Sequence, residues 1–139
     1  MVAGALVADL FAGSGALGIE ALSRGAGLVT FVESDQRAVR ALEGNVAVLG
    51  LASSSHVRPV DVWRWVENHG AALDLVLADP PYGFDRWEDL LALLATFPAS
   101  LVVAESNHPV EAAGWDVIGV RRHGGTVVTQ LRPRGATAT

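Results

Sequence analysis

Apolar segments of strand length alternate along the chain with segments in which apolar residues recur every three or four positions. The first kind predicts buried strands, here over residues 5–11, 28–33, 56–60, 73–78 and 101–104. The second kind predicts helices over residues 16–24, 35–49, 61–69 and 86–97. Because continuous apolar strands alternate with helices, we expect an α/β fold, a mostly parallel sheet with helices on both faces.

Polar residues and glycines set the predicted ends of these helices. Ser34 and Asp61 stand where N-caps are expected, and Asp85 with Glu88, three positions later, has the spacing of a capping box. Gly25 follows the first predicted helix as its C-terminal stop.

The last part of the chain has a different pattern. Residues 115–121 and 126–132 alternate apolar with polar positions around His123-Gly124-Gly125, which predicts an antiparallel hairpin. Residues 109–114 fit a short helix or a loop. We expect one domain over residues 1–133 and a disordered tail over 134–139.

Composition narrows the functional classes. The 139 residues include no cysteine, which excludes a disulfide framework, thiol catalysis and a thiolate metal site. No apolar run approaches the roughly 20 residues that span a bilayer, and no signal peptide is expected, so the sequence predicts a soluble cytoplasmic protein with no membrane partner. Ten basic residues against 15 acidic ones give a net charge of −5, which alone argues against a nucleic-acid partner.

A glycine-rich turn follows the first predicted strand. Gly13, Gly15 and Gly18 satisfy the pattern G-x-G-x-x-G at the start of a helix, where a ligand can approach the backbone closely. Glu33 ends the second strand, where a carboxylate can accept protons from both ribose hydroxyls. This pattern alone fits a dinucleotide, another adenosine-containing cofactor, or a plain tight turn with a surface glutamate. We call residues 12–15 the glycine turn.

Asp9 helps to distinguish between these candidate ligands. A carboxylate inside the first strand would repel a pyrophosphate, but it suits a cofactor with sulfonium and ammonium groups. Residues 9–15, Asp-Leu-Phe-Ala-Gly-Ser-Gly, resemble the first motif of S-adenosylmethionine-dependent methyltransferases. By that resemblance Asp61 holds the adenine amino group beside the backbone N–H of Val62. A simple helix cap is the alternative for Asp61, and both roles are compatible.

Asp79-Pro80-Pro81-Tyr82, the DPPY turn, follows the fourth predicted strand. It resembles the motif of methyltransferases that act on exocyclic amines of bases. Two acceptors, the Asp79 carboxylate and the Pro80 carbonyl, would localise the lone pair of a poorly nucleophilic amine. The prolines fix the backbone, and Tyr82 offers a face for stacking a flipped base. The alternative is a turn held by its prolines around a buried aromatic residue. Because the chain also contains the glycine turn, this alternative is the less favoured interpretation.

The whole chain resembles the RsmD family, whose members methylate guanine N2 in 16S ribosomal RNA. The resemblance rests on residues 9–25, 31–37, 79–82 and 103–106 and covers residues 5–133. It implies a class I methyltransferase fold, a Rossmann-like three-layer α/β/α sandwich of about seven strands. It also implies S-adenosylmethionine as cofactor and a partner in 16S rRNA, within the 30S subunit or an assembly intermediate.

The resemblance assigns residues as well. The implied cofactor contacts are Asp9, Ala12, Gly13, Ser14, Gly15, Glu33, Ser34, Asp61, Val62 and Asp79. The implied catalytic residues are Asp79, Pro80, Pro81 and Tyr82. Family members carry an arginine-rich N-terminal arm that this chain lacks, so we expect weak cofactor and RNA binding and little methylation.

Several weaker features have two interpretations. Glu105 and Ser106 follow the fifth strand and could line a target pocket or belong to a loop. The histidines have no metal-ligand spacing, so no metal is expected. The four tryptophans fit packing better than base stacking, although Trp87 could border a pocket. A C-terminal group of basic residues fits a solvated hairpin, with RNA phosphate contact second: Arg121, Arg122, His123, Arg132 and Arg134.

Two other functions remain open at this point. A DNA adenine-N6 or cytosine-N4 methyltransferase shares the DPPY chemistry, but such enzymes usually carry a target-recognition domain for which this chain has no room. A cofactor-binding module without activity is the second. We expect a monomer.

Overall fold

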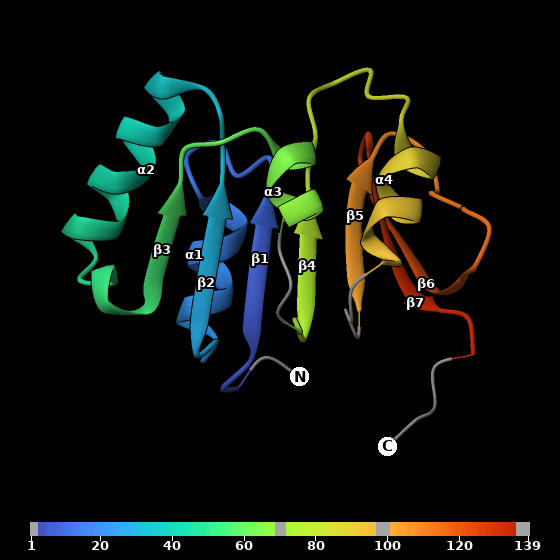
Figure 1. Ribbon diagram of the computed structural model, residues 1–139, viewed down its shortest axis with the longest axis horizontal. Helices are drawn as coiled ribbons and strands as arrows, with labels where there is room; N and C mark the ends of the chain where they lie inside the picture. Colours follow the sequence, from blue (N-terminus) through green and yellow to red (C-terminus); the bar gives the residue numbers. More distant parts are fainter. Residues whose placement is uncertain (1–2, 69–71, 97–100, 136–139) are drawn as a thin grey trace.

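The computed structural model describes residues 3–68, 72–96 and 101–135. Within that part of the chain seven strands form one sheet with helices on both sides (Figure 1). The strands are β1 (Leu6–Leu10), β2 (Leu28–Val32), β3 (Ser55–Arg58), β4 (Leu75–Ala78), β5 (Val102–Ser106), β6 (Trp115–His123) and β7 (Thr126–Pro133). The helices are α1 (Ala16–Ser23), α2 (Gln36–Val48), α3 (Val62–Asn68) and α4 (Trp87–Leu94), with a 3₁₀ turn at Ala52–Ser54.

The strand order is β3-β2-β1-β4-β5-β7-β6. The first five of these strands are parallel, and β7 runs antiparallel to both β5 and β6. The mostly parallel sheet with an antiparallel C-terminal hairpin, expected from the sequence, is therefore confirmed. The order reverses at β1 and β4, which is where open α/β sheets bind ligands.

Two separate apolar clusters, one on each face of the sheet, make the fold three-layered. Successive strand residues point to opposite faces. Val7 belongs to the cluster that contains α1 and α2 residues, whereas Ala8 belongs to the cluster that contains α3 and α4 residues. Figure 1 shows α3 and α4 in front of the sheet and α1 behind it. The class I methyltransferase architecture is confirmed.

Two helix starts differ from expectation. The N-cap of α2 is Asp35 rather than Ser34, because Asp35 Oδ2 accepts from the Ala38 N–H at 3.0 Å. Helix α4 begins at Trp87, and the residue before it, Arg86, caps no N–H with its side chain. The capping box predicted from Asp85 and Glu88 is therefore wrong. The Asp61 cap is confirmed, since Asp61 Oδ2 accepts from the Arg64 N–H at 3.2 Å.

The hairpin strands extend further toward their turn than the alternation of apolar and polar residues predicted. Strand β6 extends to His123, so the turn is Gly124-Gly125 alone, and residues 107–114 form a loop rather than a helix. Arg134 is still held, because its Nε donates to Asp116 Oδ1 at 3.1 Å. Residues 69–71, 97–100 and 136–139 lie outside the described residues, and with them the predicted helix ends and most of the predicted tail. None of the helices in the described ranges has the length and apolarity needed to cross a bilayer.

Candidate functional site: the glycine turn beside the DPPY turn

The two turns are neighbours because their strands are. Leu10 of β1 pairs with Ala78 of β4 in a parallel register. Both strands end at the same edge, so the glycine turn and Asp79 leave the sheet side by side. The sequence predicted each turn at a strand end, and the register brings them together.

Backbone geometry explains the glycines of the first turn. Gly13 and Gly15 have φ of 58° and 92°, in the left-handed region that favours glycine. The Gly15 N–H donates to the Ala12 carbonyl at 2.9 Å, closing the turn before α1. A Cβ on Gly15 would run into Leu42, whereas one on Gly13 would meet nothing within 4 Å. Gly15 is thus required for packing, while the space beside Gly13 is open to a ligand.

Glu33 holds this turn in place. Its Oε1 accepts from the Gly13 N–H at 2.8 Å, and its Oε2 accepts from the Asp35 N–H at 2.9 Å. A carboxylate has about four acceptor positions, so each oxygen can still accept a hydroxyl proton. Ser34 and Ser14 are both exposed beside it.

Asp9 lies beneath the turn, only 1% exposed. Its Oδ2 accepts from the Gly18 N–H at 3.0 Å, which fixes the first turn of α1 to β1. Burial raises the pKa of Asp9 to about 7, with smaller contributions from the carboxylates of Asp79, Glu33 and Glu105, while the Gly18 hydrogen bond opposes the shift. Asp9 therefore organises the loop; a direct contact with a cofactor stays a prediction.

Asp61 stands at the end of β3 as the exposed cap of α3. The Val62 side chain is buried in the core cluster, while its backbone N–H lies in the first turn of the helix. Helix capping is thus shown for Asp61, and its contact with adenine remains a prediction.

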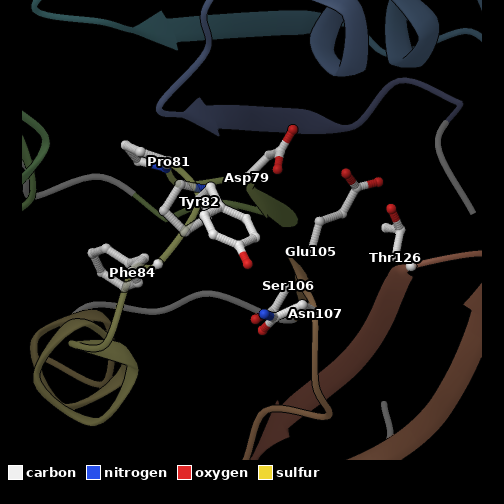
Figure 2. A pocket seen from close by; sticks show the side chains of 11 residues that line it. Asp79, Pro81, Tyr82, Phe84, Glu105, Ser106, Asn107 and Thr126 are labelled. Atoms are coloured by element: carbon white, nitrogen blue, oxygen red, sulfur yellow. The ribbon is translucent and has the colours of Figure 1, made fainter.

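A pocket opens beside the DPPY turn (Figure 2). Its volume is about 310 Å³, and it lies between the DPPY turn, the end of β5 and the Gly124-Gly125 hairpin turn. That volume falls at the low end of the range for small-molecule sites. The lining residues come from three segments: Asp79–Phe84, Glu105–Asn107 and Gly125–Thr126.

The aromatic residue of the DPPY turn is not buried. Tyr82 is 94% exposed, so the alternative of a proline-braced turn around a buried aromatic is wrong for this residue. Phe84 takes the packing role instead, edge-on to Phe11 at 5.5 Å and to Trp87 at 5.2 Å between ring centroids. The ring of Tyr82 is left to stack against a ligand.

Phe11 connects the two turns. It is the residue after β1, and its φ of 58° is unusual for a bulky side chain. Such strain persists where surrounding contacts hold it and is common at functional sites. The Phe11–Phe84 contact supplies one such constraint and ties the glycine turn to the DPPY turn.

Asp79 and Glu105 form a carboxyl pair at the pocket wall. Both line the same pocket, and they follow register partners in β4 and β5. Partial desolvation raises the pKa of Asp79, and its interaction with Glu105 opposes that shift. Partial burial, then the neighbouring charge of Asp79, raise the pKa of Glu105. Of the two interpretations open for Glu105 and Ser106, the structure supports the pocket-lining one.

Strand alternation places four carboxyl groups on one face of the sheet. The residue two positions before each of them belongs to the apolar cluster packed against α1 and α2. Side chains two apart on a strand point the same way. The four are Asp9, Glu33, Asp79 and Glu105. The sequence did not indicate that Glu105 belongs with the others, because the pattern ended the fifth strand at residue 104, whereas Glu105 lies within β5.

The remaining candidates lie elsewhere or pack. Trp87 is 5% exposed and belongs to the core, so packing rather than a pocket border is its role. Trp63 is stacked by the guanidinium of Arg86, 4.1 Å from the ring centroid. His56 and His108 are exposed, and His69 lies outside the described residues.

The comparisons with known proteins agree with this geometry. A family model described as "Conserved hypothetical protein 95" matches residues 1–132. The chain belongs to this family. The resemblance to the RsmD family is confirmed with it. YlbH of Bacillus subtilis is 37% identical over 112 residues, covering 74% of this chain and 60% of YlbH.

Two further proteins are similar to this chain. Ribosomal RNA small subunit methyltransferase D of Haemophilus influenzae is 38% identical over 90 residues, covering 62% of this chain and 46% of that protein. A solved structure of a conserved hypothetical protein from Streptococcus pyogenes superposes with a TM-score of 0.87 at 28% identity, covering 98% of this chain and 90% of that chain. The chain spans about half the length of the curated relatives it matches.

Proposed function

We propose that this chain transfers a methyl group from S-adenosylmethionine to the exocyclic N2 amine of a guanine in 16S ribosomal RNA. The observation that carries the proposal is the parallel register of Leu10 with Ala78, which sets the glycine turn beside Asp79. A donor site and an acceptor pocket then share one edge of the sheet. The name of the Haemophilus influenzae relative supports a ribosomal RNA substrate.

The residues at the glycine turn fit an adenosyl sulfonium. The space beside Gly13 is open, and Glu33 keeps free acceptor positions for ribose hydroxyls while it holds the turn. Asp61 offers an exposed carboxylate at the next strand end for the adenine amine. The cofactor supplies an electrophilic methyl group; everything else that follows is done by the chain.

The DPPY turn would prepare the nucleophile. An aryl amine delocalises its lone pair into the ring, so it attacks poorly until its hydrogens are held out of the plane. The Asp79 carboxylate and the Pro80 carbonyl accept those two hydrogens and direct the lone pair at the methyl carbon. The amine nitrogen would take the methyl group as the carbon–sulfur bond breaks and the neutral thioether is released, and the proton of the product cation would pass to the Asp79 carboxylate or to solvent. Alignment of the three atoms supplies much of the acceleration.

Tyr82 and the prolines would hold the base. The exposed Tyr82 ring offers a stacking surface at the pocket mouth, and the prolines have no backbone N–H to compete for the acceptors. We infer that the substrate is 16S rRNA in the cytoplasm, within the 30S subunit or an assembly intermediate, and that the chain acts as a monomer.

The test is to incubate the chain with labelled S-adenosylmethionine and 16S rRNA or 30S particles that lack the modification, then map the methylated base by mass spectrometry. Asp79→Asn should lower kcat about 100-fold or more, because a neutral amide oxygen is a weaker acceptor for the amine than the carboxylate, while calorimetry shows most of the cofactor affinity retained. Asp116→Asn, an exposed change on β6, should leave both unchanged.

The outcomes separate the rival functions. Label on adenine or cytosine of DNA would identify a DNA methyltransferase, and cofactor binding without transfer to any substrate would identify a non-catalytic module. Undiminished transfer by Asp79→Asn would refute the mechanism.

A further inference from the structure

The pocket beside the DPPY turn presents two carboxyl groups to one ligand. Ala78 and Ala104 are register partners in the parallel strands β4 and β5, so the residues that follow them, Asp79 and Glu105, lie side by side. Figure 2 shows both side chains at the same cavity, with Thr126 of β7 next to Glu105 and Tyr82 across from them. Because both carboxyl groups line one pocket, two adjacent polar atoms of a bound ring can reach both at once.

Bases with an exocyclic amine differ in the ring nitrogen beside that amine. In guanine the N2 amine adjoins an N1–H, so this edge offers hydrogen-bond donors side by side. In adenine and cytosine the amine adjoins a ring nitrogen that carries a lone pair and accepts. Enzymes that act on unstacked bases read them through this edge.

We propose that Glu105 is the residue that selects guanine, its carboxylate accepting the N1–H while Asp79 accepts from the neighbouring N2 amine. This inference rests on the proposed function and adds the determinant of base choice to it. Two adjacent acceptors in the protein then meet two adjacent donors in the base.

The charge of this pair favours a ligand with two donors. Partial burial and the neighbouring Asp79 raise the pKa of Glu105, because two carboxylates placed side by side repel each other. When guanine enters, each of its two N–H groups can donate to one of these carboxylates. An amine beside an unprotonated ring nitrogen would leave ionised Glu105 facing a lone pair, which is unfavourable in a partly desolvated pocket.

The test compares two RNAs, one with guanine and one with 2-aminopurine at the mapped target position, under the same buffer conditions. 2-Aminopurine keeps the N2 amine, but its N1 is an acceptor. The wild-type chain should prefer guanine in kcat/KM by about 10- to 150-fold. Glu105→Gln should reduce that preference about 10-fold or more, because the amide offers both a donor and an acceptor.

Glu105→Ala should lower kcat/KM for guanine, because the acceptor of the N1–H is lost, and raise that for 2-aminopurine, because the carboxylate no longer faces the N1 lone pair. Glu43→Gln makes the same charge change on the exposed side of α2 and is the matched control. 2-Aminopurine fluorescence gives an independent readout, since Glu105→Gln should bind the analogue more tightly than the wild type does.

The outcomes are distinct. A Glu105 variant that slows both RNAs equally, leaving their ratio at the wild-type value, overturns the selection by Glu105 and leaves the proposed function intact. A wild-type chain that transfers no methyl group to any RNA overturns the proposed function, and the selection by Glu105 with it.

Discussion

The glycine turn and the DPPY turn lie side by side, yet their polar groups are used differently. At the glycine turn the carboxylates are bound by the protein itself: Asp9 by the Gly18 N–H, and Glu33 by the N–H groups of Gly13 and Asp35. Beside the DPPY turn the carboxyl groups of Asp79 and Glu105 line an open pocket. The same face of one sheet thus carries carboxylates that hold the backbone in place and carboxyl groups that face a cavity.

The difference separates stability from activity. Backbone N–H groups donate to Asp9 and Glu33 and so hold the glycine turn in place. A substitution of either residue therefore disturbs folding as well as ligand binding. Tyr82 is almost fully exposed, so a change there removes few contacts within the protein. Three substitutions test this difference, and they are ordered from the largest expected effect on stability to the smallest.

Asp9→Asn should remove a pH dependence of folding. The pKa of Asp9 is about 7 in the folded chain and 3.8 in its ordinary state, so the native state holds a proton that the unfolded state has lost between these values. Stability contributed by this group therefore falls as the pH rises from 4 to 7, by about 1.4 kcal/mol per pH unit or about 4 kcal/mol in all. Urea unfolding at several pH values measures the slope.

Asparagine keeps an acceptor for Gly18 but has no proton to lose, so its curve should lack this part of the slope. Asp79 and Glu105, whose pKa values are also raised, titrate in both proteins and cancel in the difference. Parallel stability curves for the two proteins would show that Asp9 is ionised in the fold.

Gly18→Ala should destabilise the chain by about 1–3 kcal/mol, because overpacking a close contact forces neighbours to move. A Cβ at this position would overlap the Phe31 ring and lie 2.9 Å from Asp9 Oδ2. Gly44→Ala is the matched control, since Gly44 is exposed in the middle of α2 with nothing within 4 Å of the added Cβ. That variant should gain about 0.5–1 kcal/mol from helix propensity. Equal signs for the two, in thermal or urea unfolding, would contradict the packing argument.

Tyr82→Ala should change the free energy of unfolding by less than about 0.5 kcal/mol, as substitutions of exposed side chains do. The same variant should bind or methylate its RNA about 5- to 150-fold less well, because stacking on an aromatic ring contributes about 1–3 kcal/mol per base. Tyr82→Phe keeps the ring and should behave as the wild type. A large loss of stability with no loss of RNA binding would place Tyr82 in the fold rather than in the site.

Much of this architecture is predictable because it follows from short-range patterns. Strand alternation, helix periodicity and the order of the turns all lie in neighbouring residues, and the register of parallel strands then brings Asp79 to the glycine turn. Helix starts were less predictable, since Ser34 and Asp35 are both good caps and only the backbone around Glu33 decides between them. Asp85 and Glu88 had the spacing of a capping box, but α4 begins at Trp87, so Asp85 lies one residue before the cap position and Glu88 is already in the first turn.

The partners of each carboxyl group were beyond the sequence. Nothing in the spacing of Asp79 and Glu105, 26 positions apart, shows that they are neighbours at one pocket; the pairing of β4 with β5 does. Likewise the sequence does not show which of the two rings is exposed. Tyr82 points to solvent, whereas Phe84, two residues later, packs against Phe11.

The contact between Phe11 and Phe84 has a thermodynamic consequence. It joins a strained residue, Phe11, which precedes the glycine turn, to the segment that follows the DPPY turn. If entry of a base shifts Phe84, the conformational energy of Phe11 changes with it, and so does the affinity of the neighbouring turn for its ligand. Such linkage is reciprocal, so a donor that binds more tightly in the presence of the base must tighten the binding of the base by the same factor. Two rings, in edge-to-face contact, would thus make the two substrates of one reaction cooperative.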